Sequence, residues 1–132
     1  MSGRGLNTYR QTQVQSRTPL ELVVMLYDGA LVSLSSARAA IERRDIASRR
    51  DSIGRALAII SELQSTLNME QGGEVAAQLD ELYEFASRRL LDATIKNEVT
   101  PVDEVSRVFT TLRDAWQTIA APPAAAAAGQ RA

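Results

Sequence analysis

The sequence has 132 residues, of which 45% are hydrophobic and 23% are charged, and its 15 basic and 16 acidic side chains leave a net charge of −1. This length suits one domain with a hydrophobic core, and this composition argues against disorder along the whole chain. A net charge so close to zero provides no general attraction to nucleic acid or to an anionic membrane. We therefore expect neither as a partner.

The sequence contains no cysteine and no histidine. Their absence excludes zinc sites with the common ligand sets, Cys–His and Ser–His nucleophile pairs, and di-iron bundle sites that require histidine. We predict no metal and no cofactor. We find no apolar run of signal-peptide length and no stretch close to the roughly 20 apolar residues of a membrane span. The expectation is a soluble, cytoplasmic protein without membrane insertion.

Residues 1–17 are mostly polar, and their larger apolar side chains are Leu6, Tyr9 and Val14. Such a segment buries too little surface to order itself. It is either a flexible tail or a strip that lies on an apolar face of the helix that follows.

The first predicted helix covers residues 19–43. Thr18 can accept a hydrogen bond from the amide of Glu21, and Pro19 occupies the first helical position, where its missing N–H costs nothing. At about 100° per residue, one broad apolar sector is assigned to the core: Leu20, Val23, Val24, Tyr27, Ala30, Leu31, Leu34, Ala37 and Ile41.

A second apolar stripe lies on the far side of this helix, formed by Leu22, Met25 and Val32, with Gly29 near them. A glycine in a helix interior costs about 0.8 to 1 kcal/mol relative to alanine. We therefore expect another group to approach the backbone closely at Gly29. The stripe is either part of a larger core or a surface that meets a partner.

The second predicted helix covers residues 46–67 and is capped by Asp45. Its core side contains Ile46, Ile53, Ala56, Leu57, Ile60, Leu63 and Leu67, and Ile59 lies off that side. Five arginines surround its start: Arg43, Arg44, Arg49, Arg50 and Arg55. Acidic residues alternate with them, which favours solvated ion pairs over a phosphate-binding patch.

After a loop at 68–73, the third predicted helix covers residues 74–96. Its core side contains Val75, Leu79, Leu82, Ala86, Leu90 and Ala93, with Tyr83 at the edge, whereas Leu91 and Ile95 lie on the opposite side.

The fourth predicted helix begins with Thr100 as its N-cap and Pro101 as its first residue. Its apolar residues recur at steps of three and four: Val102, Val105, Phe109, Leu112, Trp116 and Ile119. Pro122 and Pro123 end it, and the Pro/Ala-rich residues 121–132 are predicted to be disordered.

These elements predict an all-α fold, in which residues 18–120 form an antiparallel four-helix up-and-down bundle with an extra N-terminal segment or short helix. The acidic clusters lie on solvent faces and lack the spacing of a carboxylate pair across a cleft, and Gly72 and Gly73 lack the context of a phosphate loop. We therefore expect no catalytic site. The surplus apolar side chains on three helices instead require a partner, a second copy or the N-terminal segment to cover them.

Several separated motifs resemble those of FliS-type flagellar export chaperones. Tyr9 and Val14, T-P at 18–19, E-L at 21–22 and M-L-Y-D-G at 25–29 are similar to the N-terminal signature of that family. The later matches agree in order and spacing: L-Q-S-T-L-N at 63–68, L-Y-E-F-A-S-R-R-L at 82–90, A-T-I-K-N at 93–97 and L-R-D-A-W at 112–116. The similarity covers about residues 9–119. The Pro/Ala tail and the preference for arginine over lysine depart from a typical member.

This resemblance implies a non-enzymatic chaperone that binds the disordered C-terminal segment of flagellin in the cytoplasm. It would prevent premature polymerisation and deliver flagellin to the flagellar type III export machinery. The resemblance also implies that Tyr9 and Val14 belong to a segment that covers the client groove and moves aside. The residues that we assign to client binding are Leu22, Met25, Tyr27, Gly29, Val32, Ile59, Leu63, Leu91 and Ile95.

Two alternatives remain. The surplus apolar stripes could pair two copies in a homodimeric structural or interaction module that has no secreted client. A weaker alternative uses the arginine cluster to bind nucleic acid.

Overall fold

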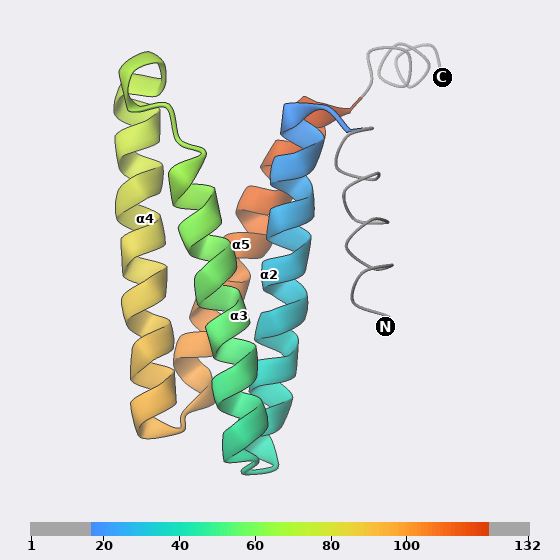
Figure 1. Ribbon diagram of the computed structural model, residues 1–132, viewed down its shortest axis with the longest axis vertical. Coiled ribbons are helices and arrows are strands. Elements are labelled where there is room, and N and C mark those ends of the chain that lie inside the picture. Colours follow the sequence, from blue (N-terminus) through green and yellow to red (C-terminus); the bar gives the residue numbers. More distant parts are fainter. Residues whose placement is uncertain (1–16, 122–132) are drawn as a thin grey trace, which may run out of the picture.

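The computed structural model describes residues 17–121, which form four helices: α2 (Pro19–Glu42), α3 (Ile46–Ser65), α4 (Met69–Lys96) and α5 (Val99–Ala120). Successive helices run in opposite directions, so that α2 and α4 begin at the same end of the molecule (Figure 1). Both α2 and α4 pack against α3 and α5, and α2 does so more closely. The expected all-α bundle is confirmed. The expected N-terminal segment and the Pro/Ala tail lie outside the described residues, apart from Arg17 and Ala121.

Side-chain caps fix the starts of the first three of these helices. The Thr18 side chain accepts a hydrogen bond from the Glu21 amide at 3.1 Å, and Asp45 accepts one from the Ser48 amide at 3.1 Å. Asn68 caps α4 by accepting from the Gln71 amide at 3.0 Å. These oxygens satisfy amides that have no partner inside the helix.

Two helix starts differ from the expectation. Helix α4 begins five residues early, at Met69, and its first turn is separated from the rest by a kink at Gly73, where φ is 53° and ψ is −126°. Helix α5 begins at Val99 after Glu98, so the assignment of Thr100 as N-cap was wrong. Pro101 occupies the third position instead, where a missing N–H still removes no intrahelical bond.

An aromatic cluster from three helices fills the middle of the bundle. The ring centroid of Tyr27 lies 5.2 Å from that of Phe109 and 6.5 Å from that of Tyr83, and the Tyr83 and Phe109 centroids are 6.2 Å apart. The Tyr27 and Tyr83 hydroxyls share a buried hydrogen bond of 2.6 Å. Tyr83 is only 1% exposed, so its expected position at the edge of the core was wrong.

Three residues that were expected in the core are instead exposed: Ile46 at 56%, Val75 at 64% and Ile119 at 61%. Each lies in the first or last turns of its helix, where a neighbouring helix no longer covers it. The remaining side chains of the expected stripes are buried or packed against the core, except that Leu20 and Leu82 are only partly buried.

Among the described residues, helix α2 is long and apolar enough to cross a membrane by length and composition alone, a test that core helices also pass. In the bundle it is a core helix, because Tyr27, Ala30, Leu34 and Ala37 are fully buried against the other helices. The single apolar helix is thus explained by its burial within the protein.

The shared hydroxyl bond yields a first prediction. Tyr27→Phe leaves the buried Tyr83 hydroxyl without this partner, which should lower the free energy of unfolding by about 1 to 3 kcal/mol. The double variant Tyr27→Phe/Tyr83→Phe removes both hydroxyls and should cost less than the sum of the two single variants. Urea denaturation monitored by circular dichroism measures these differences. Strict additivity would show that the hydroxyls do not interact.

The glycines in the interiors of α2 and α3, Gly29 and Gly54, yield a second prediction. A Cβ at Gly54 would meet no atom within 4 Å, so Gly54→Ala should raise the free energy of unfolding by about 0.8 to 1 kcal/mol. A Cβ at Gly29 would lie 3.2 Å from Ile59 Cδ1, so Gly29→Ala should gain less. Adding Ile59→Val, which removes that atom, should restore part of the gain in Gly29→Ala. Equal gains at both glycines would contradict this contact.

Candidate functional site

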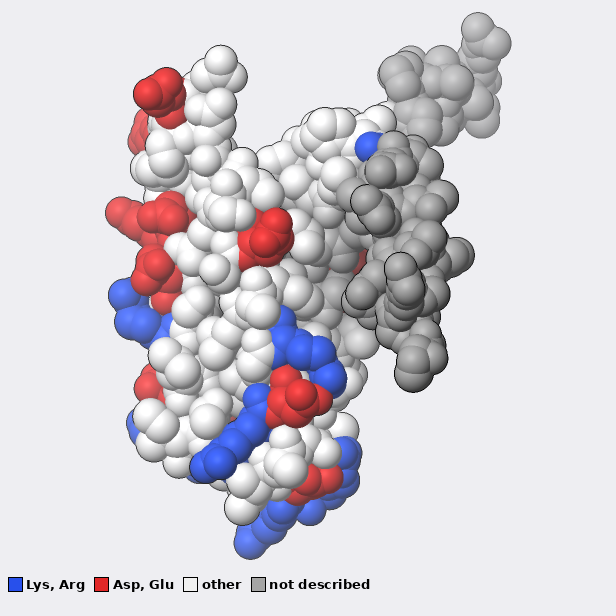
Figure 2. All heavy atoms as spheres, in the orientation of Figure 1, with Lys and Arg blue, Asp and Glu red and all other residues white. Residues whose placement is uncertain are grey.

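An apolar pocket of about 430 Å³ opens at the end of the bundle where α2 and α4 begin and α3 and α5 end. Figure 2 shows the corresponding hollow between the start of α4 on one side and the start of α2 and the end of α5 on the other. The pocket is lined by Pro19, Leu20, Leu22, Val23, Leu26, Thr66, Leu67, Asn68, Gly72, Val75, Ala76, Leu79, Tyr83 and Trp116.

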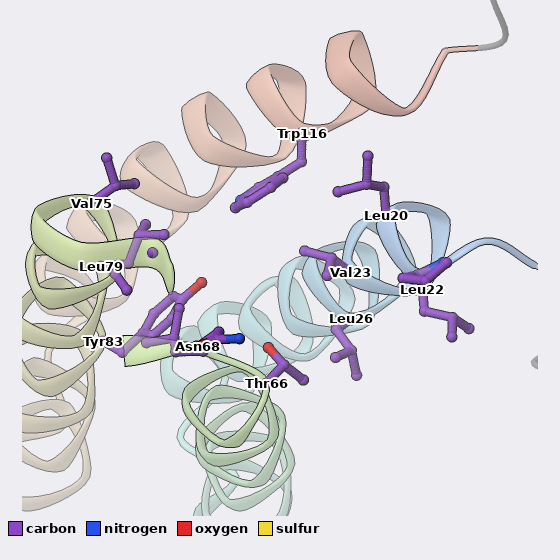
Figure 3. A pocket seen from close by; sticks show the side chains of 14 residues that line it. Leu20, Leu22, Val23, Leu26, Thr66, Asn68, Val75, Leu79, Tyr83 and Trp116 are labelled. Carbon is purple, nitrogen blue, oxygen red and sulfur yellow. The ribbon is translucent and has the colours of Figure 1, made fainter. Parts of the chain in front are cut away.

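Each wall of the pocket comes from a different element (Figure 3). Leucines and valines of the first two turns of α2 form one wall, and Val75 and Leu79 of α4 face them across the opening. Trp116 reaches in from α5 between these walls. The pocket exists because α4, which kinks at Gly73, packs less closely against its neighbours than α2 does.

The polar side chains that line the pocket are Thr66, Asn68 and Tyr83, and the buried Tyr83 hydroxyl is hydrogen-bonded to Tyr27. Burial raises the pKa of both hydroxyls above the ordinary value for tyrosine. Both therefore stay neutral at physiological pH, and the pocket offers apolar surface with a few neutral polar groups. It holds no charged side chain that could act as an acid, a base or a nucleophile.

The residues that we assigned to client binding do not form one continuous surface. Leu22 lines the apolar pocket, whereas Met25 lines a more polar hollow of about 280 Å³ between α2 and α5. Val32 is 66% exposed on α2, and Leu91 and Ile95 are 50% and 80% exposed on α4. Since α2 and α4 are separated by α3 and α5, these apolar side chains lie on different sides of the bundle.

Two of the assigned residues belong to the core. Tyr27 and Leu63 have no exposed surface, and Tyr27 is held by Tyr83 and Phe109. A client could reach these two side chains only if the bundle opened, and their assignment to client binding stays a prediction.

Gly29 and Ile59 meet each other. The Ile59 side chain covers the backbone at Gly29, so the expected close approach there comes from within the protein. Both are partly buried and contribute little open surface. Tyr9 and Val14, assigned to the covering segment, lie outside the described residues.

The sequence patterns missed most of the pocket lining. Val23, Leu67, Leu79 and Trp116 follow the helical period of the core, and that period cannot show where two helices move apart. The adjacent glycines at 72 and 73 were a usable signal, because α4 kinks there beside the pocket.

The described part of the chain contains no group of three or more acidic residues that could hold a metal ion. Around the start of α3, Arg43 pairs with Asp45 at 3.5 Å and Arg55 with Asp51 at 2.6 Å. These pairs agree with the expected solvated ion pairs in the arginine cluster.

The family model "Flagellar protein FliS" matches residues 2–123 of this chain. The chain belongs to the FliS family. Flagellar secretion chaperone FliS from Salmonella typhimurium is 35% identical to this chain over 120 residues, which cover 87% of this chain and 89% of that protein. Flagellar secretion chaperone FliSB from Pseudomonas aeruginosa is 38% identical over 109 residues, covering 83% and 86%.

Flagellar secretion chaperone FliS from Bacillus subtilis is likewise 38% identical over 109 residues, covering 83% of this chain and 80% of that protein. A crystal structure of a flagellar chaperone from bacteria matches with a TM-score of 0.72 over 90% of this chain and 97% of that chain. Its 16% identity supports the fold alone. The FliS relatives confirm the resemblance seen in the sequence motifs, and this chain is a flagellar export chaperone by family.

The division of the helix faces can be checked by three matched substitutions to glutamine. Val32→Gln and Ile95→Gln change exposed positions and should alter the free energy of unfolding by less than about 0.5 kcal/mol. Leu63→Gln places an amide in the core and should cost at least about 2 kcal/mol. Thermal denaturation compares the three variants. Similar losses in all three would mean that Val32 and Ile95 are core residues.

Proposed function

We propose that this chain binds the disordered C-terminal segment of flagellin in the cytoplasm, keeps it from polymerising early and delivers it to the flagellar type III export machinery. The observation that best supports the proposal is the open apolar pocket between α2, α4 and α5. Soluble proteins seldom leave such surface uncovered unless it binds something. The FliS family membership directs the choice to a secreted flagellar client.

The distribution of apolar side chains favours an unfolded client over a folded one. The pocket, Val32 on α2, and Leu91 and Ile95 on α4 lie on separate parts of the bundle. A single straight helix or a flat protein surface could not contact all of them, whereas a flexible segment could wrap around the bundle and order as it binds. That ordering costs about 2 to 5 kcal/mol or more, which burial of the apolar side chains has to exceed.

The N-terminal segment is proposed to cover part of this surface before the client arrives. Arg17 is followed in sequence by Thr18, Pro19 and Leu20, and the last two of these line the pocket. A chain extends about 3.3 to 3.6 Å per residue, so Tyr9 and Val14 are near enough in sequence to reach it. Competition between this segment and the client would keep the pocket covered in the free chaperone.

We further propose that the chain acts by binding alone and is not an enzyme. The FliS family is one of chaperones, and the residues that line the pocket include no acid, base or charged nucleophile. Masking of the client needs only complementary apolar surface.

Isothermal titration calorimetry with the C-terminal segment of the same organism's flagellin tests this function. We expect a 1:1 complex and a negative heat-capacity change, because binding buries apolar surface. Deletion of residues 1–17 should leave the affinity unchanged or raise it. Absence of binding at tens of micromolar would contradict the proposal.

A matched pair of variants locates the interaction. Val75 lines the pocket and Ile46 lies at the opposite end of the bundle; both are exposed β-branched residues near a helix start. Val75→Ser should weaken client binding about tenfold, the equivalent of about 1.4 kcal/mol of lost burial. Ile46→Ser should leave it unchanged. Equal effects would mean that the client does not use the pocket.

The second candidate is a homodimer without a secreted client, favoured by the exposed apolar side chains Phe85, Leu91 and Ile95 on α4. Sedimentation velocity separates the two functions. A monomer at all concentrations would exclude the homodimer, and a stable dimer that does not bind flagellin would exclude the chaperone function.

A further inference from the structure

The α3–α4 side of the bundle beside the apolar pocket carries an excess of acidic residues, which we call the acidic wall. Residues 56–87, which cover the second half of α3 and about the first two thirds of α4, contain no lysine or arginine. They contain six acidic residues: Glu62, Glu70, Glu74, Asp80, Glu81 and Glu84. Figure 2 shows acidic side chains gathered over the upper half of α4 and basic side chains mainly over the lower half of the molecule.

The charges of this acidic wall are uncompensated within residues 17–121. None of the six carboxylates forms an ion pair with a described basic residue, and the only side chain to bind Asp80 and Glu84 is the neutral amide of Gln64, at 3.1 and 2.8 Å. At the opposite end, acidic residues pair with arginines, as Asp103 does with Arg38 at 2.8 Å. The acidic excess is therefore a property of the pocket's end of the bundle.

The acidic residues lie next to the apolar lining in sequence. Gly72, Val75 and Leu79 line the pocket. Glu70 and Glu74 lie two residues to either side of Gly72, Glu74 directly precedes Val75, and Asp80 directly follows Leu79. Glu70 and Glu74 are exposed. A bound segment that continues from the pocket over the start of α4 would therefore meet exposed carboxylates that have no basic partner among the described residues.

We propose that the pocket and its acidic wall bind an amphipathic segment in which large apolar side chains are flanked by lysine or arginine. The apolar side chains would enter the pocket, and the basic ones would contact Glu70, Glu74 and their acidic neighbours. Charge complementarity of this kind speeds association and rejects acidic segments of equal hydrophobicity. The inference rests on the proposed function, since it defines which part of the client the pocket selects.

Trp116 provides a direct readout, because it lines the pocket and is the only tryptophan in the chain. The test uses the full-length protein and two synthetic helical peptides of about 18 residues, or five turns. One carries leucines along one face and lysines elsewhere, and the other has glutamate in place of every lysine. Neither peptide contains tryptophan, so the fluorescence reports the pocket alone.

We expect the lysine peptide to change Trp116 emission saturably and the glutamate peptide to leave it unchanged. The affinity of the lysine peptide should fall at least about tenfold between about 50 and about 500 mM salt, because the contacts with the acidic wall are exposed and screened. Equal binding of the two peptides, or binding that does not depend on salt, would overturn the inference.

A second pair of variants tests the acidic wall without altering the apolar lining. Glu70→Gln/Glu74→Gln should weaken binding of the lysine peptide at least about threefold, in line with the loss of two partly screened contacts. Glu98→Gln, an exposed glutamate at the opposite end of the bundle, should have no effect. Circular dichroism confirms that each variant keeps its helices. Equal affinities in all three proteins would overturn the inference.

Other occupants would give distinct results. One such result is that deletion of residues 1–16 changes Trp116 emission, whereas the lysine peptide changes it neither before nor after the deletion. The occupant of the pocket would then be the protein's own N-terminal segment. If the emission depends on protein concentration alone, the pocket belongs to a second copy. Either result would overturn the inference.

Parallel calorimetry with the flagellin segment separates this inference from the proposed function. If flagellin binds the wild type and Glu70→Gln/Glu74→Gln equally well, the chaperone function stands and the inference about the acidic wall is wrong. If the lysine peptide behaves as expected and flagellin does not bind, the proposed client is wrong and the specificity of the pocket stands.

Discussion

The hydrogen bond between Tyr27 and Tyr83 joins the two helices that lie diagonally across the bundle. Helices α2 and α4 otherwise pack mainly against α3 and α5. Together with Phe109, the two tyrosines close the middle of the protein, and their combined bulk and buried hydroxyls require a well-defined geometry. The apolar pocket lies between this aromatic cluster and the end of the bundle where α2 and α4 begin, and Tyr83 belongs to both the cluster and the pocket lining.

The same aromatic cluster explains how a stable fold can keep an open apolar pocket. The cluster and the aliphatic residues beyond it, such as Leu34, Ile53 and Val102, supply a buried core that does not depend on the other end of the molecule. The ends of α2, α4 and α5 can then leave apolar side chains uncovered while the bundle remains folded. The bundle can therefore present apolar surface at one end without losing the core that keeps it folded.

The architecture could be predicted well from the sequence, because helix caps and apolar periodicity depend on residues that are close together in the chain. The Thr18 and Asp45 caps and the apolar period of the helices placed α2, α3 and most of α4 and α5 correctly. A resemblance to a known family was also visible in motifs such as M-L-Y-D-G at 25–29, and the FliS match confirms it. The end of α4 at Lys96 was predicted correctly, whereas the start of α5 was placed two residues late because Glu98, and not Thr100, precedes the helix.

The candidate site was less predictable because it depends on the distance between helices. Helical periodicity assigned Leu79 and Trp116 to the core and Val32 to the surface, but it could not show that α2 and α4 diverge above Tyr83. It also could not show that Leu22 and Ile95 lie on different sides of the bundle. The acidic character of the α3–α4 end was present in the composition of residues 56–87, and it became informative only once the pocket was seen beside it.

The most direct test of this account is photo-cross-linking of the full-length chaperone to the flagellin C-terminal segment, with a benzophenone amino acid at position 75 or position 46. Both positions are exposed, and only the first borders the pocket. The account predicts an efficient cross-link from position 75 and little or none from position 46. Cross-linking from position 46 alone, or with equal efficiency from both positions, would show that the client does not bind at the apolar pocket.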